Sequence, residues 1–571
     1  MAPLLLLAAL VWGCASADMA TSAMPGGGED TWVYSGQGTA TTDDVGQATL
    51  LTDASKAGDT APPGDVDDNG SSKTENIQPS MGLVLPGAQN IAKFRELVAQ
   101  GQVPLASDFP MEGWFNEVGS PLPAADAARP VDLHALGAIV AEPGNPPTIL
   151  LQLGFNTAKN LADLQPALGL VVLVDTSGSM DAERLAAVRQ GILALSDNLP
   201  TGSYLAVLGF SSEVQQLWAA AEWQPAARTE LDAALAGLKG SGGTDLYVAF
   251  EGAAAVPASM PKSIKQQRVL LCSDGSSTQG GHSPAELVAQ VDKLGLSLSA
   301  IGVGPQPRTG LLNALAKTGN GTYYEAPQLA AIAKAFTVDL QTLLVPVAQN
   351  LRVQVKLAAG WQIANAYGLP FKQQGSTMIL GEADSQTGAS DVGSGTADVS
   401  SAPDAITAQD GTSPVAPALA STLYPSQHNG MVVLRLAPPA GTVVDQALQL
   451  DLATVQWQYQ LTASGQSFSH DTKVLVKGLV QIPDGALEFF SQPIARRTAA
   501  LVLLGEAMRK ACGQAHGQAT TAEALATLEA AKTFAKRMLD AITPANDDPQ
   551  GSLSDAVALA AQLYNNISAK P

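Results

Sequence analysis

Residues 171–180 read VVLVDTSGSM, and this stretch decides the fold. Four apolar residues lead without a break into Asp175, and Ser177 and Ser179 follow at alternate positions. The apolar run is typical of a strand that is buried on both faces, and a helical pattern begins a few residues later. In an open α/β sheet, ligands bind at the carboxyl ends of the strands, which is where these three side chains fall. Gly178 is expected to permit a tight bend between the two serines.

The motif has a simpler interpretation when it is taken alone. Asp and Ser are common helix caps, so Asp175 or Ser179 could serve only to start the helix that is expected near Asp181. Metal binding is favoured because other segments of the chain converge on the same edge of the sheet.

Two further segments are expected at that edge. Residues 241–245, SGGTD, form a glycine-rich loop that opens a helix, and Asp274 follows a strand at 268–273. Together the three loops supply two carboxylates and three hydroxyls, which are hard donors that favour Mg²⁺, Ca²⁺ or Mn²⁺ over Zn²⁺. Asp245 is interpreted as the residue that starts the helix and not as a ligand. The predicted metal ligands are Asp175, Ser177, Ser179, Thr244 and Asp274.

The charge of this ligand set has a consequence for binding. Two carboxylates only balance a dication, and hydroxyls are neutral, weak donors. The ion should therefore stay electrophilic and attract one more anionic oxygen. An Asp or Glu carboxylate on a partner protein is the predicted candidate.

Strand and helix patterns alternate from residue 166 to about residue 345. Continuous apolar runs predict buried strands at 168–174, 204–210, 269–272 and 298–303. Helical stretches are predicted at 182–195, 229–238, 246–255, 284–293, 310–317 and 328–343. This alternation predicts a doubly wound, Rossmann-like α/β sheet.

The three loops resemble the metal-ion-dependent adhesion site (MIDAS) of von Willebrand factor type A domains. The aspartate and two serines of the family's first motif, its threonine and its last aspartate match the five predicted ligands without substitution. The resemblance covers roughly residues 166–345 and implies that these residues coordinate a divalent ion, some of them through water.

The flanking segments are similar to those of bacterial secreted type A proteins of the calcium-activated-chloride-channel-like group. The similarity rests on NIAKFR at 90–95, GQVP at 101–104, AKNL at 158–161 and LATV at 452–455. It implies a β-rich domain that is built from segments before and after the α/β domain. The sequence EGWFN at 112–116 departs from the group's motif, so the resemblance is weaker here than in the metal site.

A chain of 571 residues is too long for one core, so more than one domain is expected. The sequence outside the α/β domain predicts three further regions. Residues 85–165 are expected to form the N-terminal part of the β-rich domain. Residues 346–485 are expected to complete it as a sandwich, with a disordered low-complexity insertion at 384–418. Residues 486–571 have helical periodicity and predict a C-terminal helical region.

The first eighty residues indicate where the protein is sent. Residues 1–17 have the size and apolar character of a signal peptide. VWGC at 11–14 resembles a lipobox with lipidation at Cys14, whereas Ala15-Ser16-Ala17 fits ordinary cleavage after Ala17. Residues 18–80 are polar and glycine-rich and predict a flexible linker. We therefore expect a cell-envelope protein, either lipid-anchored or secreted.

Composition and motifs limit the classes of partner and activity that the chain is expected to have. A net charge of −21 disfavours nucleic acid and anionic membrane surfaces as partners. There is no G-x-S-x-G elbow and no Ser-His-Asp order, which favours a non-enzymatic, metal-dependent protein-binding module for adhesion or assembly. Two alternatives stay open: a metal-dependent hydrolase, with Asp245 as the only base in view, and an envelope protein that the ion merely stabilises.

Overall fold

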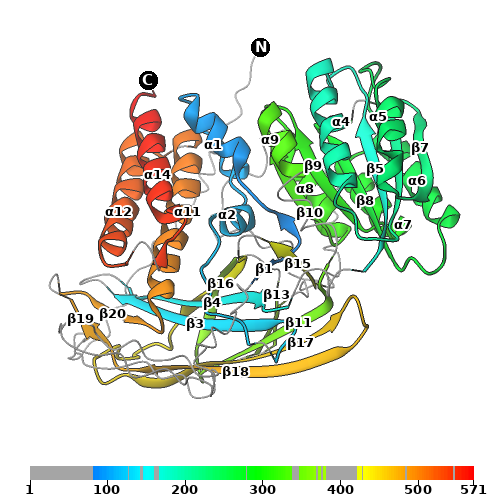
Figure 1. Cartoon of the computed structure of the whole chain (residues 1–571). Coiled ribbons are helices and arrows are strands. Elements are labelled where there is room, and N and C mark those ends of the chain that lie inside the picture. The colour runs from blue at the N-terminus through cyan, green and yellow to red at the C-terminus, as the bar shows by residue number, and fades with distance from the viewer. Residues whose placement is uncertain are drawn as a thin grey trace, which may run out of the picture.

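The computed structural model describes residues 81–570, apart from 127, 142–145, 160–165, 278, 337–345, 368–370, 375–376, 381–420, 427–428, 483–484, 518 and 544–546. The expected signal peptide with Cys14, the linker at 18–80 and the insertion at 384–418 lie outside the described residues. Figure 1 shows three parts: an α/β domain, a group of long C-terminal helices beside it, and a large β-rich region beneath both.

A seven-stranded sheet forms the centre of the α/β domain. The order is β2-β10-β9-β8-β5-β6-β7, and every neighbouring pair is parallel except β6 and β7. The strands are β2 (Gly87–Ala88), β5 (Leu168–Asp175), β6 (Tyr204–Phe210), β7 (Val214–Glu222), β8 (Gln266–Ser273), β9 (Leu298–Val303) and β10 (Thr322–Ala326). The helices are α4 (Ala182–Ser196), α5 (Arg228–Leu235), α6 (Leu246–Ala255), α7 (Pro284–Leu294), α8 (Thr309–Thr318) and α9 (Leu329–Lys334), with 3₁₀ turns η2 (Pro225–Ala227) and η3 (Val256–Ser259).

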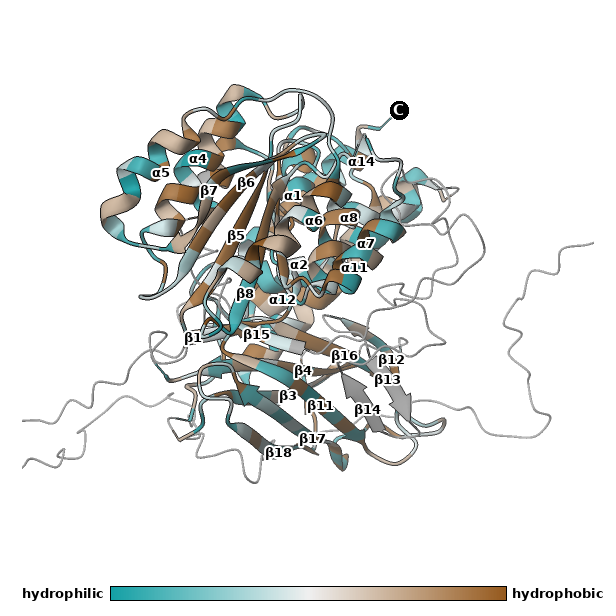
Figure 2. Cartoon of the chain, turned by 90° about the vertical axis from the view of Figure 1, so that its right-hand side faces the viewer, coloured by the Kyte–Doolittle hydropathy of each residue, from teal (hydrophilic) through white to brown (hydrophobic). Residues whose placement is uncertain are grey.

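Helices cover both faces of this sheet, and the alternation of side chains along β5 explains why. Leu170 and Val172 join a core with α4, α5 and α9, whereas Val171 and Leu173 join a second core with α6, α7 and α8. A central strand of this kind must be apolar at every position, as the sequence is. In Figure 2, β5 and β6 lie as hydrophobic ribbons between the helix layers. The predicted doubly wound α/β fold is confirmed.

The sequence did not reveal three strands of this sheet, which are β7, β10 and the two-residue β2. β7 is the antiparallel edge strand, and most of its side chains are exposed or half-buried, so it lacks the apolar run of a central strand. β10 has five residues and includes Thr322 and Glu325, both buried, which hide its apolar character. The helix predicted at 328–343 appears as α9, and residues 337–345 are outside the described part.

Among the described residues, thirteen strands form the β-rich region as one hydrogen-bonded network. They are β1 (Met81–Val84), β3 (Asp132–Ala141), β4 (Thr148–Thr157), β11 (Ala348–Leu357), β12 (Gln362–Tyr367), β13 (Phe371–Gln374), β14 (Thr377–Leu380), β15 (Ser421–Ser426), β16 (Met431–Ala437), β17 (Gln449–Leu461), β18 (Ser467–Lys477), β19 (Val480–Gln481) and β20 (Leu487–Phe490). Two layers face each other, because a Cβ at Gly137 of β3 would lie 3.1 Å from Val474 of β18 and 3.3 Å from Leu452 of β17. We predicted a sandwich. In the structure β1 pairs with both β4 and β15 and so joins the two layers into one sheet.

The third part is a helical body. It contains α11 (Pro493–His516), α12 (Thr521–Asp540) and α14 (Ser552–Ser568), and α1 (Ala92–Ala99), η1 (Ala106–Asp108) and α2 (Met111–Val118) pack with them. Trp114 and Phe115 are fully buried in this core. Cys512 is also buried here, whereas Cys272 is buried in the α/β domain, and both thiols are free.

The segment before the α/β domain contributes to all three parts. β1 joins the β-rich sheet, β2 extends the α/β sheet beside β10, and α1 and α2 pack into the helical body. The sequence placed residues 85–165 with the β-rich domain alone. The sequence could not show that this segment also joins the α/β sheet, because β2 has only two residues.

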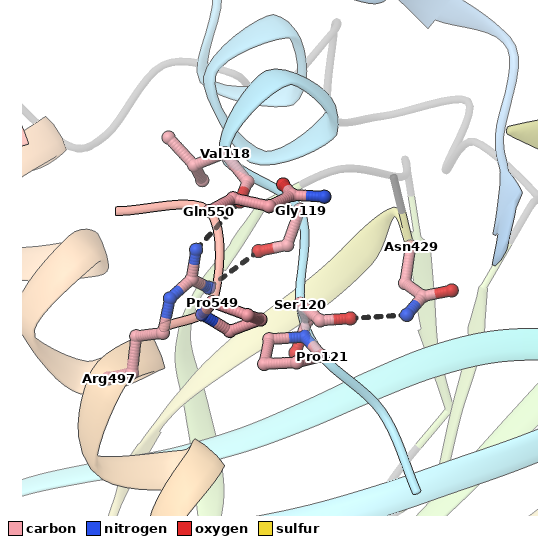
Figure 3. Close-up of a pocket in the computed structure, with 8 residues that line it drawn as sticks. All are labelled: Val118, Gly119, Ser120, Pro121, Asn429, Arg497, Pro549 and Gln550. Atoms are coloured by element: carbon pink, nitrogen blue, oxygen red, sulfur yellow. Dashed lines mark hydrogen bonds between the residues drawn. The ribbon is translucent and has the colours of Figure 1, made fainter. Parts of the chain in front are cut away.

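A buried ion pair fixes the C-terminal helices to α2. Arg497 donates from Nε to Asp548 at 2.7 Å, and its other nitrogens donate to the carbonyls of Val118 and Gly119 at 2.7 and 2.8 Å. Figure 3 shows Arg497 and its two carbonyl partners, Val118 and Gly119, at a small cavity of about 50 Å³. Because the guanidinium is fully engaged, this arrangement is structural.

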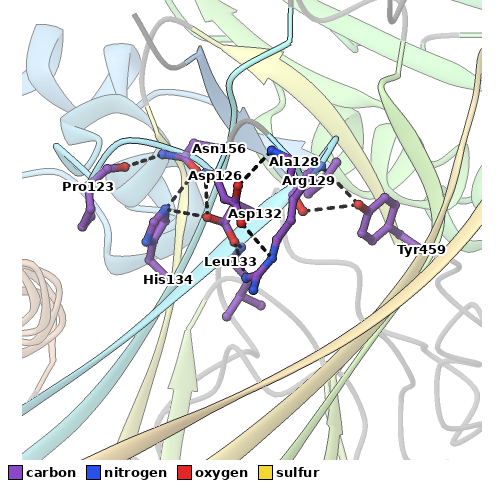
Figure 4. A network of polar contacts seen from close by, with 10 residues as sticks. Pro123, Asp126, Ala128, Arg129, Asp132, Leu133, His134, Asn156 and Tyr459 are labelled. Atoms are coloured by element: carbon purple, nitrogen blue, oxygen red, sulfur yellow. Dashed lines mark hydrogen bonds and ion pairs between the residues drawn. The ribbon is translucent and has the colours of Figure 1, made fainter. Parts of the chain in front are cut away.

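A second polar network anchors the segment before β3. Arg129 Nη1 lies 3.1 Å from Asp132 Oδ1, and His134 Nε2 lies 3.0 Å from Asn156 Oδ1 (Figure 4). Burial lowers the pKa of His134, so the ring stays neutral around pH 7. The Tyr459 hydroxyl donates to the carbonyl of Val131 at 3.3 Å, which ties this segment to β17.

A buried polar cluster joins the α/β domain to the helical body. The Glu325 side chain on β10 accepts from the Thr309 hydroxyl at 2.7 Å and from the Lys93 N–H at 2.8 Å. The Lys93 ammonium lies 3.0 Å from Asp108. Burial raises the pKa of Glu325 to about 7.

This cluster predicts a pH dependence of stability. Glu325 titrates near 4.5 in an unfolded chain, so between pH 4.5 and about 7 the folded protein holds its proton more tightly. The contribution is fully present below pH 4.5 and is lost as the pH rises through 7, by at most about 1.4 kcal/mol per pH unit. Glu325→Gln should remove this slope, as measured by urea unfolding at pH 5, 6, 7 and 8. The exposed Glu230→Gln is the matched control, and a slope that persists in Glu325→Gln contradicts the account.

Candidate functional site

Three loops meet at one edge of the α/β sheet, where β5 and β8 end. The first loop (residues 176–181) follows β5, the second (240–245) precedes α6, and the third (274–283) follows β8. Backbone hydrogen bonds tie the loops together: Gly178 N–H to Gly242 O, Ser241 N–H to Thr176 O, and Gln279 N–H to Thr244 O, at 2.8 to 3.0 Å. The predicted convergence of the three segments is therefore seen in the structure.

Asp175 is the deepest residue of the site. It is fully buried at the end of β5, and its Oδ1 accepts from the Ser177 N–H at 2.9 Å. Its Oδ2 accepts from the Ser273 hydroxyl at 2.6 Å. Burial raises the pKa of Asp175, and the nearby negative charge of Asp274 raises it further, against the hydrogen bonds from Ser177 and Ser273 that lower it. A cation would relieve both the burial of the charge and its repulsion from Asp274.

Ser177 and Ser179 lie together beside Asp175. Their hydroxyl oxygens are 3.0 Å apart, with Ser177 buried and Ser179 exposed. Arg184 Nη1 donates to the Ser179 carbonyl at 2.6 Å, which holds the end of the loop against α4. Neither serine caps that helix, because Asp181 does so by accepting from the Arg184 N–H. The simpler capping interpretation of Asp175 and Ser179 is therefore wrong.

The second loop places Thr244 and Asp245. Thr244 is buried, and its carbonyl accepts from Gln279 of the third loop. Asp245 caps α6 by accepting from the Tyr247 and Val248 N–H groups, so the prediction that it starts this helix is confirmed. Gly240 is required because a Cβ there would lie 2.1 Å from the Met180 carbonyl oxygen.

Gly178 does not provide the bend that was expected of it. Its φ angle is not in the left-handed region, so the turn between the serines does not depend on glycine freedom. Its N–H bonds the second loop, and a Cβ would lie 3.4 Å from the Gly242 oxygen, which is an ordinary van der Waals contact. The contribution of this position is therefore its backbone hydrogen bond.

Asp274 faces the site from the third loop. It is half-buried, and its Oδ1 accepts from the Ser276 N–H at 2.8 Å. Its negative charge raises the pKa of Asp175. The structure therefore brings Asp175, Ser177 and Ser179 together, places Asp274 directly after the serine that donates to Asp175, and places Thr244 in the loop that bonds to both neighbours.

Sequence reasoning missed Ser273, which holds the site in shape. It is fully buried, donates to Asp175 and accepts from the Gly275 N–H at 2.9 Å. One hydroxyl thus connects the deepest carboxylate to the turn that carries Asp274. The signal was available, since Ser273 is a polar residue at the end of an otherwise apolar strand.

The donor set fits a hard dication. Two adjacent carboxylates and hydroxyl oxygens suit Mg²⁺, Ca²⁺ or Mn²⁺. Within the described ranges, no group of three or more His, Cys, Asp or Glu side chains could hold a metal, so this site relies on its hydroxyls. Because Asp175 is buried and Ser179 is exposed, an ion bound here would keep one side toward solvent.

Comparison with known proteins identifies the domain that carries these loops. The sequence profile of the von Willebrand factor type A domain matches residues 168–325, which include all five predicted ligands. Over 286 residues the chain is 24% identical to the uncharacterized protein YfbK of Escherichia coli (strain K12), covering 47% of this chain and 48% of that protein. The chain thus spans about half the length of this curated relative.

Two solved structures are also similar. The von Willebrand factor type A protein from Catenulispora acidiphila is 15% identical, with a TM-score of 0.43, over 74% of this chain and 87% of that chain. Proximal thread matrix protein 1 from the mussel byssus, in a structure with a zinc-occupied MIDAS motif, is 18% identical, with a TM-score of 0.26, over 31% of this chain and 45% of that chain.

The Ser273 bridge predicts a change in metal affinity. Groups that orient a metal ligand typically contribute roughly 10- to 100-fold in affinity, so Ser273→Ala should weaken Mg²⁺ binding by about tenfold or more. Isothermal titration calorimetry measures this. Ser276→Ala is the control, because Ser276 supports Asp274 through its backbone N–H and keeps that bond. Equal affinity of Ser273→Ala and the unchanged protein would contradict the role of the bridge.

Proposed function

Residues 168–325 form a von Willebrand factor type A domain, and on that premise we propose that the chain is a divalent-cation-dependent protein-binding module of the cell envelope. Domains of this family typically mediate protein interactions and metal-dependent binding. In the proposal, Asp175, Ser177, Ser179, Thr244 and Asp274 hold the ion, and a partner's Asp or Glu carboxylate completes its coordination.

One observation carries the proposal: a fully buried carboxylate and an exposed serine belong to the same small site, linked through Ser177. Asp175 lies below the surface, and Ser179 lies at the surface. The protein supplies two negative charges, which only balance the ion. Hydroxyl ligands withdraw little of its positive charge, so a carboxylate arriving from solvent would gain a strong, water-poor contact.

We propose Mg²⁺ as the resident ion, with Ca²⁺ or Mn²⁺ as alternatives. Mg²⁺ accepts one or two carboxylates and keeps several waters, which suits a site with two aspartates and room on its outer side. Ca²⁺ takes more oxygen ligands at longer distances, and the two ions can be separated by competition.

The proposed location rests on the N-terminus. A signal peptide at residues 1–17, with lipidation at Cys14 or cleavage after Ala17, would deliver the protein to the envelope. In the part of the chain that the structure describes, no helix has the length and apolar character needed to cross a bilayer.

The two other functions make different demands on the site. A metal-dependent hydrolase needs a base near the ion, and the Asp245 carboxylate is already engaged as the cap of α6. A purely structural ion predicts that losing the ion lowers thermal stability first and that partner binding is lost only as a consequence.

Affinity capture tests the proposal. The full chain is immobilised and exposed to an envelope extract with Mg²⁺ or with a chelator. We expect a partner to be captured with Mg²⁺, released by chelator and absent with Asp175→Asn. The control is Asp292→Asn, an exposed aspartate on α7, which should capture normally. Amidation of the carboxylates in the captured fraction should abolish rebinding.

Three results would reject metal-bridged binding. The first is capture that is unchanged by chelator, and the second is capture that persists with Asp175→Asn. The third is a lower thermal midpoint for Asp175→Asn that accounts for the whole loss of capture, which would favour the structural role. Thermal unfolding of both variants in chelator separates this last case.

A further inference from the structure

A second polar cavity lies where α8 of the α/β domain meets the helical body. Its volume is about 150 Å³. α8 lines it with Asn313 and Lys317, the start of α2 with Pro110 to Glu112, and α11 with Arg509. The cavity is separate from the metal site, since none of the five predicted ligands lines it.

The ionic groups that line the cavity do not balance. Lys317 lies 2.6 Å from Glu112, and Asn313 Nδ2 donates to the same Glu112 oxygen at 2.9 Å. Glu112 is therefore matched by Lys317. Arg509 is half-buried and forms no hydrogen bond or ion pair with any residue that the structure describes. One positive charge is left over, in a chain whose net charge is −21.

Two further features favour an anion. α2 begins at the cavity wall, and no side chain of the described residues caps its N-terminus, so the positive end of the helix dipole lies beside Arg509. The Asn313 amide must turn its nitrogen to Glu112, which leaves Asn313 Oδ1 buried with no donor among the described residues. A ligand that satisfies both Arg509 and this oxygen needs negative oxygens and one hydroxyl donor.

We propose that this cavity binds a small oxyanion that carries a hydroxyl group, such as hydrogen phosphate or a short α-hydroxy acid. Its charged oxygens pair with the Arg509 guanidinium, and its hydroxyl donates to Asn313 Oδ1. Guanidinium groups suit such anions because their N–H donors match two oxygens at once.

The position of the cavity gives the ligand a consequence for the whole molecule. Asn313 belongs to the α/β domain and Arg509 to the helical body, so one bound anion connects the two parts. Binding should stabilise their junction and slow amide hydrogen exchange in α8 and α2. Anion binding in this cavity does not depend on the divalent ion at the three loops.

Calorimetric titration of the full chain in chelator tests the proposal. The probes are inorganic phosphate, sulfate, glycolate and acetate, at constant ionic strength. We expect saturable binding of phosphate or glycolate with a Kd on the order of 1 mM or tighter. Sulfate and acetate, which lack a hydroxyl donor at pH 7, should bind several-fold more weakly. Whichever of phosphate and glycolate binds more tightly identifies the chemical class of the natural ligand.

Variants assign the binding to the cavity. Arg509→Gln should weaken the preferred anion by roughly tenfold or more, because a charge-assisted contact is lost. Lys510→Gln, at the next, exposed position of α11, is the matched control and should bind normally. Ser107→Glu adds a negative charge at the exposed rim of the cavity, leaves Arg509 in place and should also weaken binding.

Specific outcomes overturn the proposal. They are no saturable binding of any probe, an unchanged affinity in both Arg509→Gln and Ser107→Glu, or equal affinity for the hydroxylated and non-hydroxylated anions. The first two reject the anion site, and the third rejects the role of Asn313. Hydrogen exchange in α8 that does not respond to a bound anion rejects the connection between the two parts.

Discussion

A carboxylate that is excluded from water at the end of β5 is the constraint on which the site depends. Asp175 is surrounded by apolar strands, so its charge must be stabilised by what the loops supply. Ser177 and Ser273 donate to its two oxygens, and each donor also fixes a different loop. Burial makes the charged form of Asp175 unfavourable when no counter-charge is present. A bound cation would stabilise that charge and would also offset the repulsion from Asp274.

The fold places this carboxylate through the order of its strands. β5 lies inside the sheet, with β8 on one side and β6 on the other, so the loops that follow β5 and β8 leave the sheet side by side at the same edge. The same sheet is extended at its far edge by β2, which comes from the segment before the domain. Glu325 and Lys93 then join that edge to the helical body. The α/β domain is therefore anchored at the edge away from β7.

The parts of the fold and of the site that could be predicted are those whose sequence pattern lies between near neighbours in the chain. The apolar run at 168–174 and the helix start at Asp245 depend on neighbours in sequence, and both were predicted correctly. The α/β alternation followed from the same runs.

Ser273 was missed because its importance comes from Asp175, almost one hundred residues earlier, and β2 was missed because two residues carry no periodicity. Gly178 was assigned a bend, whereas what the structure shows there is a backbone hydrogen bond to Gly242 of the second loop. The same limit applies to Arg509: that no described residue serves as its counter-ion becomes visible only when α8, α2 and α11 are brought together.

The central claim is that a divalent ion lies among the three loops with one side open to solvent. A crystal of the full chain grown with Mn²⁺, measured at the manganese absorption edge, tests it most directly. The account predicts one anomalous peak between Asp175, Ser177, Ser179, Thr244 and Asp274, with protein or water oxygens at roughly 2.0–2.6 Å and a solvent oxygen on the Ser179 side. A site without a peak, or an ion enclosed by protein oxygens on every side, would contradict it.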